Sequence, residues 1–360
     1  MLLPSVFYGQ IDSIAILAKA KINEVSENPV YSILLYIDKA DKVIFNKGYG
    51  KLDKDSFFVS KNDKFRIASS TKLFVSTIIL QLIEEGKILL NDEVFEYVKG
   101  LDYLDFENFQ ILNNKKYANE ITIKQLLSHR SGLADIFSDK EETFFSMILK
   151  NPEKQYSVQS IAKLYYKYKL NLSPHFEPNK GWHYSDMNYF LLGLIIEKID
   201  QTSLAESIRN RILNPLKMKD TYFEFYEKPT QKNNLLNQYV GSVNFSKINT
   251  SFDWSGGGLV STNKDLALFI KSLFNLKLIN RESLNKMIDV KYTKDHENRY
   301  GLGIYESHYN GHIYFGHYGF YGTYVGYCPE NKTTISYSIS QGIPDFNVYS
   351  FINKTLKLAE

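Results

Sequence analysis

The strand-like segments of this chain lie at its two ends, and its helical segments lie mainly between them. Residues 31–38 and 42–50 are β-rich runs joined by a short polar turn, which predicts a hairpin. Three further β-rich runs lie near the C-terminus, at 312–317, 321–328 and 332–340. This order favours a single sheet that is assembled from both ends of the chain, with a mostly helical region inserted between them.

The helices that we expect have apolar residues at helical spacing. They span residues 10–26, 69–85, 185–199 and 345–359. Ser185 is suited to be the N-cap of the third of these helices, and Gly86 closes the second. The stretch 102–120 shows neither the helical nor the strand-like spacing of apolar residues, so we expect it to be a long surface loop.

Composition excludes several classes of function. The formal net charge of +3 over 360 residues, without a block of like charges, argues against nucleic acid or an anionic membrane as a partner. Cys328 is the single cysteine, which excludes an intramolecular disulfide and a cysteine-based metal site. Gln10 and Asp12 interrupt the apolar N-terminal stretch, which has no basic region, so we expect no signal peptide or membrane anchor there. The compartment stays open: cytoplasmic if this N-terminus is native, periplasmic or extracellular if a leader was removed.

The stretch FRIASSTKLFVSTIILQLIEEGK (65–87) places Ser69 one helical turn before Lys72, at the start of a long apolar run. Residues three apart on a helix share a face, so these two side chains can form a hydrogen bond. A serine hydroxyl becomes a nucleophile only when a base takes its proton. The positive end of the helix dipole would also favour negative charge on the attacking oxygen. The pair is therefore a candidate catalytic site.

The spacing alone is a weak signal, because the chain contains three other serines with a lysine three residues later. These pairs are Ser160/Lys163, Ser261/Lys264 and Ser283/Lys286. For each of them a helix cap or a surface pair is the simpler interpretation. The helix after Ser69 differs because it is apolar on most of its circumference, which predicts burial. A lysine one turn into a buried helix is costly unless it is paired or functional, and this favours Lys72.

Several segments resemble, in order along the chain, the motifs of one family. They are FRIASSTK (65–72), LLNDEV (89–94), ITIKQLLSHRSGL (121–133), GWHYSDMNYFLLGLIIEKI (181–199), ILNPLKMKDTYF (212–223), GGGLVSTNKDLALF (256–269), YGLGIY (300–305) and GHYGFYG (316–322). The series resembles the serine β-lactamase and penicillin-binding-protein superfamily, in its branch of class C-like β-lactamases, D-alanyl-D-alanine carboxypeptidases, D-aminopeptidases and esterases. The resemblance covers roughly residues 28–345.

The resemblance implies a fold of the α/β (α+β) class. An antiparallel sheet from residues 1–86 and 246–360 would be flanked by helices, and residues 87–245 would form a mostly helical domain. The active site would lie between these two parts.

The resemblance also implies roles for individual residues. Ser69 would be the acylated nucleophile, Lys72 its activating partner, and Tyr184 the general base that relays the proton to the leaving group. The backbone N–H groups of Ser69 and Phe320 would form the oxyanion hole. No metal or organic cofactor is needed for this chemistry.

Three features depart from the family pattern. One is the absence of the usual Pro-Gly pair before Tyr184, where we expect only a reshaped loop. Asp186 stands where many members have Asn. A carboxylate near Lys72 favours the charged form of the lysine and so weakens Lys72 as a base. The simpler alternative is that Asp186 caps its helix. His317-Tyr318-Gly319 occupies the place of Lys-Thr-Gly, on a strand that would line the cleft. A histidine titrates near neutrality, so we expect it to hold a substrate carboxylate less firmly than a lysine would.

Other conspicuous residues have simpler interpretations. The tripeptide YAN at 117–119 spells a class C motif, but it precedes LLSHRSGL, so we interpret Tyr117 as a surface residue. Trp182 fits either the core or the cleft. The glycines at 256–258 are interpreted as serving backbone geometry near the cleft.

The histidines and the cysteine are also given structural interpretations. His129 is interpreted as a structural hydrogen-bonding residue. His175 and His183 lie close together, but no carboxylate at ligand spacing accompanies them, so we predict no metal site. Cys328 lies in a strand-like run and is expected to be buried.

We therefore predict a serine hydrolase that works through an acyl-enzyme on an ester, a D-amino-acid peptide or amide, or a β-lactam-like carbonyl. The changes at 317 and 318 favour esterase or peptidase activity over β-lactamase activity. The partner would be a small-molecule or peptide substrate, and the oligomeric state stays open. The alternative is a weak or inactive penicillin-binding-like protein that binds peptidoglycan-type peptides; the presence of Ser69, Lys72 and Tyr184 argues against it.

Overall fold

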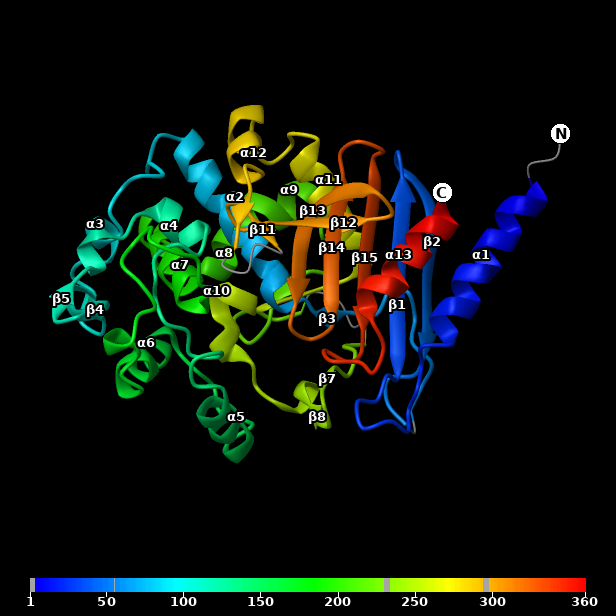
Figure 1. Cartoon of the computed structure of the whole chain (residues 1–360), viewed down its shortest axis with the longest axis horizontal. Helices are drawn as coiled ribbons and strands as arrows, with labels where there is room; N and C mark the ends of the chain where they lie inside the picture. The colour runs from blue at the N-terminus through cyan, green and yellow to red at the C-terminus, as the bar shows by residue number, and fades with distance from the viewer. Residues whose placement is uncertain (1–3, 55, 230–233, 294–297) are drawn as a thin grey trace.

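The computed structural model describes residues 4–54, 56–229, 234–293 and 298–360 (Figure 1). Its main feature is an eight-stranded antiparallel sheet. The strands are β1 (Ser32–Lys39), β2 (Lys42–Gly50), β10 (Lys291–Tyr292), β11 (Arg299–Tyr300), β12 (Tyr305–Tyr309), β13 (His312–Gly319), β14 (Thr323–Cys328) and β15 (Thr333–Ile339). Their order across the sheet is β10-β11-β12-β13-β14-β15-β1-β2.

The two ends of the chain meet inside this sheet. β1 pairs with β2 on one side and with β15 on the other, in a register that places Ile33 opposite Ile339. The predicted hairpin and the three predicted C-terminal strands are therefore confirmed, as is the single sheet built from both ends. The side chains of β1 alternate between two cores, with Ile33 and Leu35 in one and Leu34 in the other.

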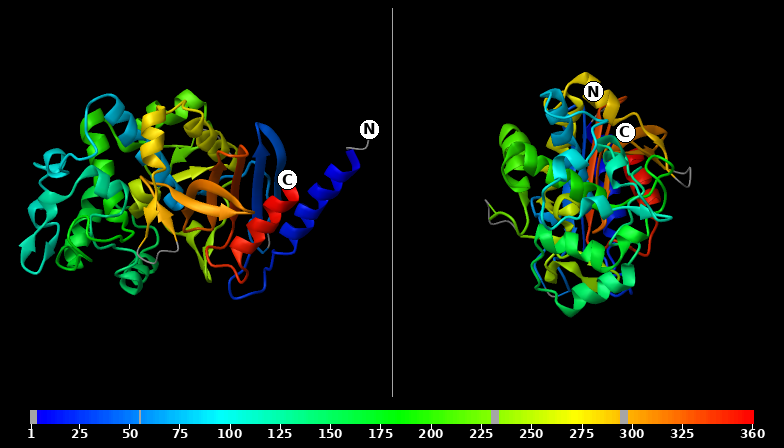
Figure 2. Two further views of the ribbon diagram at one scale, coloured as in Figure 1. Left: turned by 45° about the horizontal axis from the view of Figure 1, so that its top comes forward. Right: turned by 90° about the vertical axis from the view of Figure 1, so that its left-hand side faces the viewer.

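Helices cover both faces of the sheet. α1 (Pro4–Lys19) and α13 (Val348–Ala359) lie side by side on the outer face, where both chain ends are found (Figures 1 and 2). α11 (Asn263–Phe274) packs on the inner face against β1, β14 and β15. No helix among the described residues has the length and apolar content that crossing a membrane requires.

The inner face continues into a large helical region. Its centre is the contact between α2 (Thr71–Glu84) and α7 (Asp186–Asp200), with α10 (Trp254–Gly257) packed against both. The remaining helices are α3 (Phe95–Val98), α4 (Ile123–Leu127), α5 (Glu141–Lys150), α6 (Val158–Lys167), α8 (Leu204–Ile208), α9 (Asn214–Leu216) and α12 (Arg281–Met287). The short strands outside the large sheet are β3 (Phe65–Arg66), β4 (Ile111–Leu112), β5 (Lys115–Lys116), β6 (Tyr222–Phe223), β7 (Tyr239–Val240), β8 (Val243–Asn244) and β9 (Leu259–Ser261).

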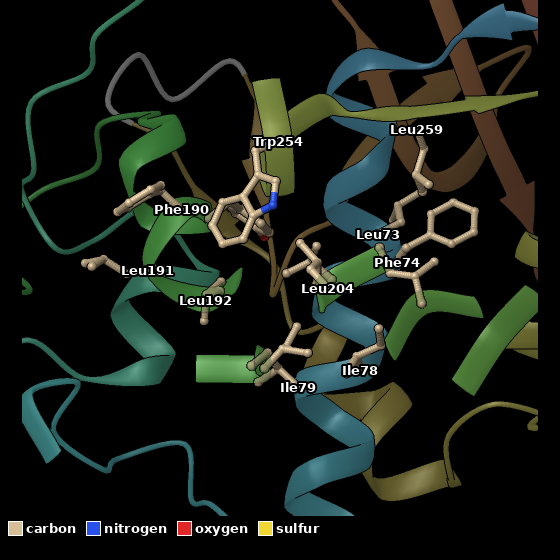
Figure 3. Close-up of a cluster of buried hydrophobic side chains, with 14 of the residues drawn as sticks. Leu73, Phe74, Ile78, Ile79, Phe190, Leu191, Leu192, Leu204, Trp254 and Leu259 are labelled. Atoms are coloured by element: carbon tan, nitrogen blue, oxygen red, sulfur yellow. The ribbon is translucent and has the colours of Figure 1, made fainter. Parts of the chain in front are cut away.

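One continuous apolar core joins the sheet to this helical region. Trp254 packs edge to face on Phe190 of α7, with ring centroids 5.5 Å apart (Figure 3). Leu73, Phe74, Ile78 and Ile79 of α2 belong to the same core, as the figure shows. The helix-rich character of 87–245 is confirmed, and the division into two domains at those boundaries stays a prediction.

Three local predictions are corrected. The first helix is Pro4–Lys19 instead of 10–26, because Asn23 pairs with Val30 and the chain must turn to enter β1. The strands β10 to β12 were not predicted. The stretch 102–120 is not a simple loop: it contains the β4–β5 hairpin, and Phe106 and Phe109 anchor it in the core.

The core contact between Phe74 and Phe269 gives a stability prediction. Both rings are fully buried and stack with centroids 3.9 Å apart. Phe74→Ala should lower the free energy of unfolding by about 3–5 kcal/mol, since it removes a buried ring and leaves a cavity. Urea titration followed by circular dichroism measures the loss. Leu89→Ala, at an exposed site, should change stability by less than about 0.5 kcal/mol; equal effects of the two variants would contradict this packing.

Candidate active site

Ser69 lies in a tight turn, η1 (Ala68–Ser70), that leads directly into α2. The helix therefore begins at Thr71, two residues later than predicted. Ala68 has φ = 45°, a left-handed conformation that costs a non-glycine residue energy and bends the chain sharply before the serine. The Ser70 hydroxyl donates a hydrogen bond to the carbonyl oxygen of His317 at 3.0 Å. The turn is thus fixed against β13, and Ser69 faces a cleft of about 800 Å³.

Lys72 is completely buried beneath this turn. Its Nζ donates to Ser69 Oγ at 3.0 Å, to Asp186 Oδ1 at 2.5 Å and to the carbonyl oxygen of Gly256 at 2.9 Å. Three acceptors match the three N–H bonds of an ammonium group. Among the described residues, this is the Ser-x-x-Lys pair whose side chains are joined by a hydrogen bond.

Asp186 is the first residue of α7, and its side chain points at Lys72. The N-cap is Ser185, whose hydroxyl accepts from the N–H of Met187, so Asp186 does not cap its helix. The N–H of Asp186 donates to Asp135 Oδ1 at 2.7 Å. Burial, together with the Asp186 charge, raises the pKa of Asp135 to about 6. Asp135 was missed by the sequence prediction, and it holds the start of α7 in place.

Gly256 is required by this ion pair. A Cβ atom at this position would lie 2.2 Å from Asp186 Oδ1. The absence of a side chain lets the backbone carbonyl reach Lys72 while the carboxylate reaches the same nitrogen. The predicted role of this glycine in the backbone geometry near the cleft is confirmed.

Tyr184 lies above Lys72, whose Nζ is 4.9 Å from the centre of the tyrosine ring. Its hydroxyl is buried and forms no hydrogen bond of ordinary geometry within the described part of the chain. Burial, together with the nearby Asp186 carboxylate, raises the pKa of Tyr184 well above its ordinary value. The nearby Ser69 hydroxyl opposes this rise only in part. The environment thus keeps Tyr184 in its phenol form.

His129 supports Tyr184 from beneath. The two rings stack with centroids 4.2 Å apart, and His129 Nδ1 accepts from the N–H of Ser185 at 3.2 Å. Asn188 Nδ2 lies 3.0 Å from the same nitrogen. Burial, together with the charge of Lys72, lowers the pKa of His129 well below its ordinary value. His129 is a structural residue, as predicted.

His317 is buried on β13 and does not behave as the sequence predicted. Its Nδ1 lies 2.7 Å from the Tyr318 carbonyl oxygen, which can only accept, so this nitrogen carries the hydrogen. Its Nε2 lies 3.1 Å from the Tyr300 hydroxyl. Burial, together with the charge of Lys72, lowers the pKa of His317 to about 3. The expectation that it titrates near neutrality is therefore wrong.

The end of β13 packs against the turn η1, which contains Ser69. A Cβ atom at Gly319 would lie 2.3 Å from the carbonyl oxygen of Ile67, just before Ala68. Phe320 follows at the strand end and is half exposed in the cleft wall. The glycine thus allows the backbone after β13 to come close to Ser69.

The charged side chains that line the cleft are acidic, and one of them, Asp186, is paired with the buried Lys72 beneath the cleft. Its described lining contains four carboxylates and no lysine or arginine side chain. The acidic residues are Asp135, Glu141, Asp186 and Asp253. Burial raises the pKa of Asp253 to about 7, although Tyr321 donates a hydrogen bond to its Oδ2 at 2.8 Å. The same cleft has an apolar wall of phenylalanines, namely Phe137, Phe144, Phe145, Phe245, Phe252 and Phe320.

All of the predicted site residues meet in one place. Ser69, Tyr184, Asp186, His317, Gly319 and Phe320 line the cleft, and Lys72 lies beneath it. Trp182 also lines the cleft, which decides between its two interpretations. The interpretation of Tyr117 as a surface residue is wrong: it is 6% exposed and donates to Glu177 Oε1 at 2.7 Å, away from this cleft. Asp253 and Tyr300 were missed, because nothing in their local sequence distinguishes them.

An antiparallel sheet flanked by helices, with Ser-x-x-Lys at the start of a buried helix, defines the serine β-lactamase and penicillin-binding-protein superfamily. The model of the Beta-lactamase family matches residues 27–350. The chain belongs to the Beta-lactamase family, which confirms the resemblance and the predicted fold class.

Three known proteins show what the chain is similar to. Protein flp of Staphylococcus aureus is 32% identical over 252 residues, which cover 69% of this chain and 46% of that protein. The chain therefore matches less than half the length of this relative. Teichoic acid D-alanine hydrolase of S. aureus is 27% identical over 290 residues, covering 79% and 65% of the two chains. The structure of a D-stereospecific amidohydrolase from Streptomyces sp. has a TM-score of 0.80, with 21% identity and coverage of 96% and 98%.

The close approach at Gly256 gives a prediction about the ion pair. Gly256→Ala should displace the Asp186 carboxylate from Lys72 and slow the reaction of Ser69 with a fluorophosphonate by about 100-fold. The rate is measured by quenching the labelling reaction at a series of times and determining the fraction of adduct from the intact-protein mass. The control is Gly86→Ala, just after the end of α2, where an added Cβ would meet no other atom. This variant should be somewhat less stable than wild type because φ is +70°, but its Ser69 should react at the wild-type rate. Wild-type labelling of Gly256→Ala would contradict the importance of this contact.

Proposed function

We propose that the chain is a serine hydrolase that acts, through an acyl-enzyme, on esters or amides whose acyl part carries a free ammonium group. The observation that carries this proposal is the cleft with four carboxylates and no cationic side chain in its described lining. A cleft lined by one sign of charge attracts ligands of the opposite sign. An aminoacyl ester or amide supplies a positive charge next to the carbonyl that Ser69 would attack.

The same cleft is unfavourable for substrates that carry a carboxylate. β-Lactams and peptides that end in D-alanine present such a group, and a lysine at the third motif would pair with it. Here His317 is uncharged and both of its nitrogens are within hydrogen-bonding distance of protein groups. This supports esterase or amidase activity over β-lactamase or carboxypeptidase activity.

The proposed first step uses the contacts of Lys72. Lys72 passes one proton to Asp186, 2.5 Å away, and the resulting amine accepts the proton of Ser69 Oγ, 3.0 Å away. Ser69 Oγ then forms a bond to the carbonyl carbon, whose oxygen becomes an oxyanion. Placed at the start of α2, this charge would be stabilised by the helix dipole and by the N–H groups of Ser69 and Phe320.

The proposed second step breaks the bond to the leaving group. Tyr184 is kept as a phenol by its burial, so it is suited to donate a proton to the departing oxygen or nitrogen. Lys72, beneath its ring, returns a proton to Tyr184. Water then attacks the acyl carbon, and the same groups in reverse release the acid and restore Ser69. No step requires a cofactor.

The relatives support this class of substrate. Teichoic acid D-alanine hydrolase is named for the removal of D-alanine, and a D-alanyl group joined through its carboxyl carries a free ammonium. The phenylalanine wall supplies an apolar surface for the rest of the substrate. D-Alanyl and D-phenylalanyl esters and amides are therefore the first substrates to test.

Replacing the nucleophile tests whether the chain is an enzyme. Wild type should gain the mass of one fluorophosphonate adduct, and Ser69→Ala should gain none, because Ser69 is the serine in contact with Lys72. Ser160→Ala, at another Ser-x-x-Lys position, should label like wild type. Intact-protein mass spectrometry gives the answer. A folded wild type without an adduct would favour the alternative of a binding protein.

The acidic cleft gives a prediction about pH. Asp253 is ionised above its pKa of about 7, and a substrate ammonium is protonated below about 8. For a D-alanyl ester, kcat/KM relative to that of the matching N-acetyl-D-alanyl ester should therefore rise as pH increases through 7 and fall again above 8. The ratio isolates the substrate charge, since titration of the catalytic groups affects both esters.

The matched variant is Asp253→Asn. It should lower kcat/KM for the cationic ester by about tenfold, which corresponds to about 1.4 kcal/mol, and leave the N-acetyl ester nearly unchanged. The rise through pH 7 should disappear. An equal loss on both esters would mean that Asp253 supports the fold of the cleft without binding the ammonium.

A further inference from the structure

Asp139, His175 and His183 converge at the edge of the cleft. The Nε2 atoms of His175 and His183 lie 2.9 Å and 3.2 Å from the same oxygen, Asp139 Oδ2. The three ligand atoms all lie within 4.8 Å of one another. Asp139 lies 36 residues before His175, so ligand spacing along the chain could not reveal it. The predicted absence of a carboxylate beside the two histidines is wrong.

The spacing of these atoms is that of ligands around one small ion. A tetrahedral zinc site with bonds of about 2.0–2.1 Å places neighbouring ligand atoms roughly 3.3–3.4 Å apart. The separations of 2.9 Å and 3.2 Å from Asp139 Oδ2 are within about half an ångström of that value. Two imidazoles and one carboxylate are also a known ligand set for Zn²⁺, with a fourth position left for water or substrate. In a tetrahedral site the two rings point at the ion from different directions, so the stacked rings of His175 and His183 must rotate apart when an ion binds.

The two histidines differ in their hydrogen bonding: His175 Nε2 is hydrogen-bonded to Asp139 Oδ2 at 2.9 Å, and His183 Nε2 is not. His183 Nε2 is buried and forms no hydrogen bond of ordinary geometry with the described residues, although Asp139 is near. The rings of His175 and His183 stack with centroids 3.4 Å apart. Asp139 Oδ2 has a further donor, the N–H of Asp135, at 2.7 Å. Asp139 Oδ2 thus faces three nitrogen atoms, and two of them are histidine nitrogens that can turn their lone pairs toward a bound cation.

The backbone holds both histidines in position. The N–H of His175 donates to the carbonyl oxygen of Gly132 at 2.9 Å, and the N–H of His183 donates to that of His129 at 3.0 Å. Both segments are therefore fixed to the same stretch that supports Tyr184. The side chain of His175 is 34% exposed, which gives an ion a route from solvent. A ligand set on a fixed backbone loses little entropy when an ion binds.

We propose that Asp139, His175 and His183 form a binding site for one divalent transition-metal ion, with Zn²⁺ as the preferred ion. The proposal is independent of the proposed hydrolase function, in which no step uses a metal. An ion there would join the 135–139 segment to the residue that precedes Tyr184, and so stiffen the wall of the cleft.

A second cluster provides the matched control. His312, Cys328 and Glu330 also bring their ligand atoms within 4.8 Å of one another, on the strands β13 and β14 and the turn after them. Cys328 is fully buried there. His312→Ala removes a histidine from that cluster and leaves the proposed site intact.

The experiment is titration of the full chain, free of any histidine tag, with Zn²⁺ in a calorimeter and with Co²⁺ in a visible spectrometer. Wild type should bind one ion, and Co²⁺ should develop the intense d–d bands of a tetrahedral site. His175→Ala should weaken Zn²⁺ binding by at least about tenfold and abolish those bands. His312→Ala should bind both ions like wild type.

Protein stability gives a second readout that does not depend on activity. Saturating Zn²⁺ should raise the melting temperature of wild type and of His312→Ala, and should raise that of His175→Ala much less. Because His175 is partly exposed, its replacement is compatible with folding, and the melting curve without metal checks this. Absence of binding by wild type, retention of wild-type affinity by His175→Ala, or loss of binding in His312→Ala would each overturn the proposal.

Discussion

The buried ammonium group of Lys72 is the constraint on which the site depends. A charge removed from water is costly unless paired and hydrogen-bonded, and here three acceptors surround one nitrogen. Each acceptor comes from a different element: the turn before α2, the start of α7, and α10. These elements must therefore pack at fixed distances, which the core around Trp254 provides. The absence of a side chain at Gly256 and the support of Asp186 by Asp135 follow from the same requirement.

Much of the fold could be predicted from sequence because its signals are local. The β1–β2 hairpin, α7 with its Ser185 cap, and the buried α2 each have the period that was predicted, with ends that lie within two residues of the predicted ones. The strands β10 to β12 were missed, and their place in the sheet depends on pairing with β13 more than on local preference. The stretch 102–120 was misjudged for a related reason: single apolar residues anchor it without forming a period.

Some residues of the candidate site could be predicted from the sequence, and others could not. Ser69, Lys72 and Tyr184 lie in motifs that a reader of the sequence can find. Asp253 cannot be found in this way, because its importance comes from the cleft wall that it shares with Asp186 and from its burial there. The environment of His317 was also hidden, since its pairing with Tyr300 joins two strands across the sheet. The sequence was enough to identify the motif residues of the site. The burial of these side chains and their hydrogen-bond partners could be known only from the structure.

The surroundings of Ser69 and Lys72 differ from the Lys-Thr-Gly pattern at the third motif of the family. A lysine at the third motif would place a positive charge beside Ser69 and favour a substrate carboxylate. In this chain that position holds an uncharged, buried histidine, and carboxylates line the opposite walls. Under the proposed function, the field of these carboxylates favours a positive group on the substrate, while Lys72 keeps its contact with Ser69. A field of this sign acts on whichever charged group the substrate brings within a few ångströms of Ser69, and in such a partly buried cleft salt screens it only weakly. Under the proposed function, selection between cationic and anionic acyl groups would depend on these surrounding residues, and Ser69, Lys72 and Tyr184 would be the same for both.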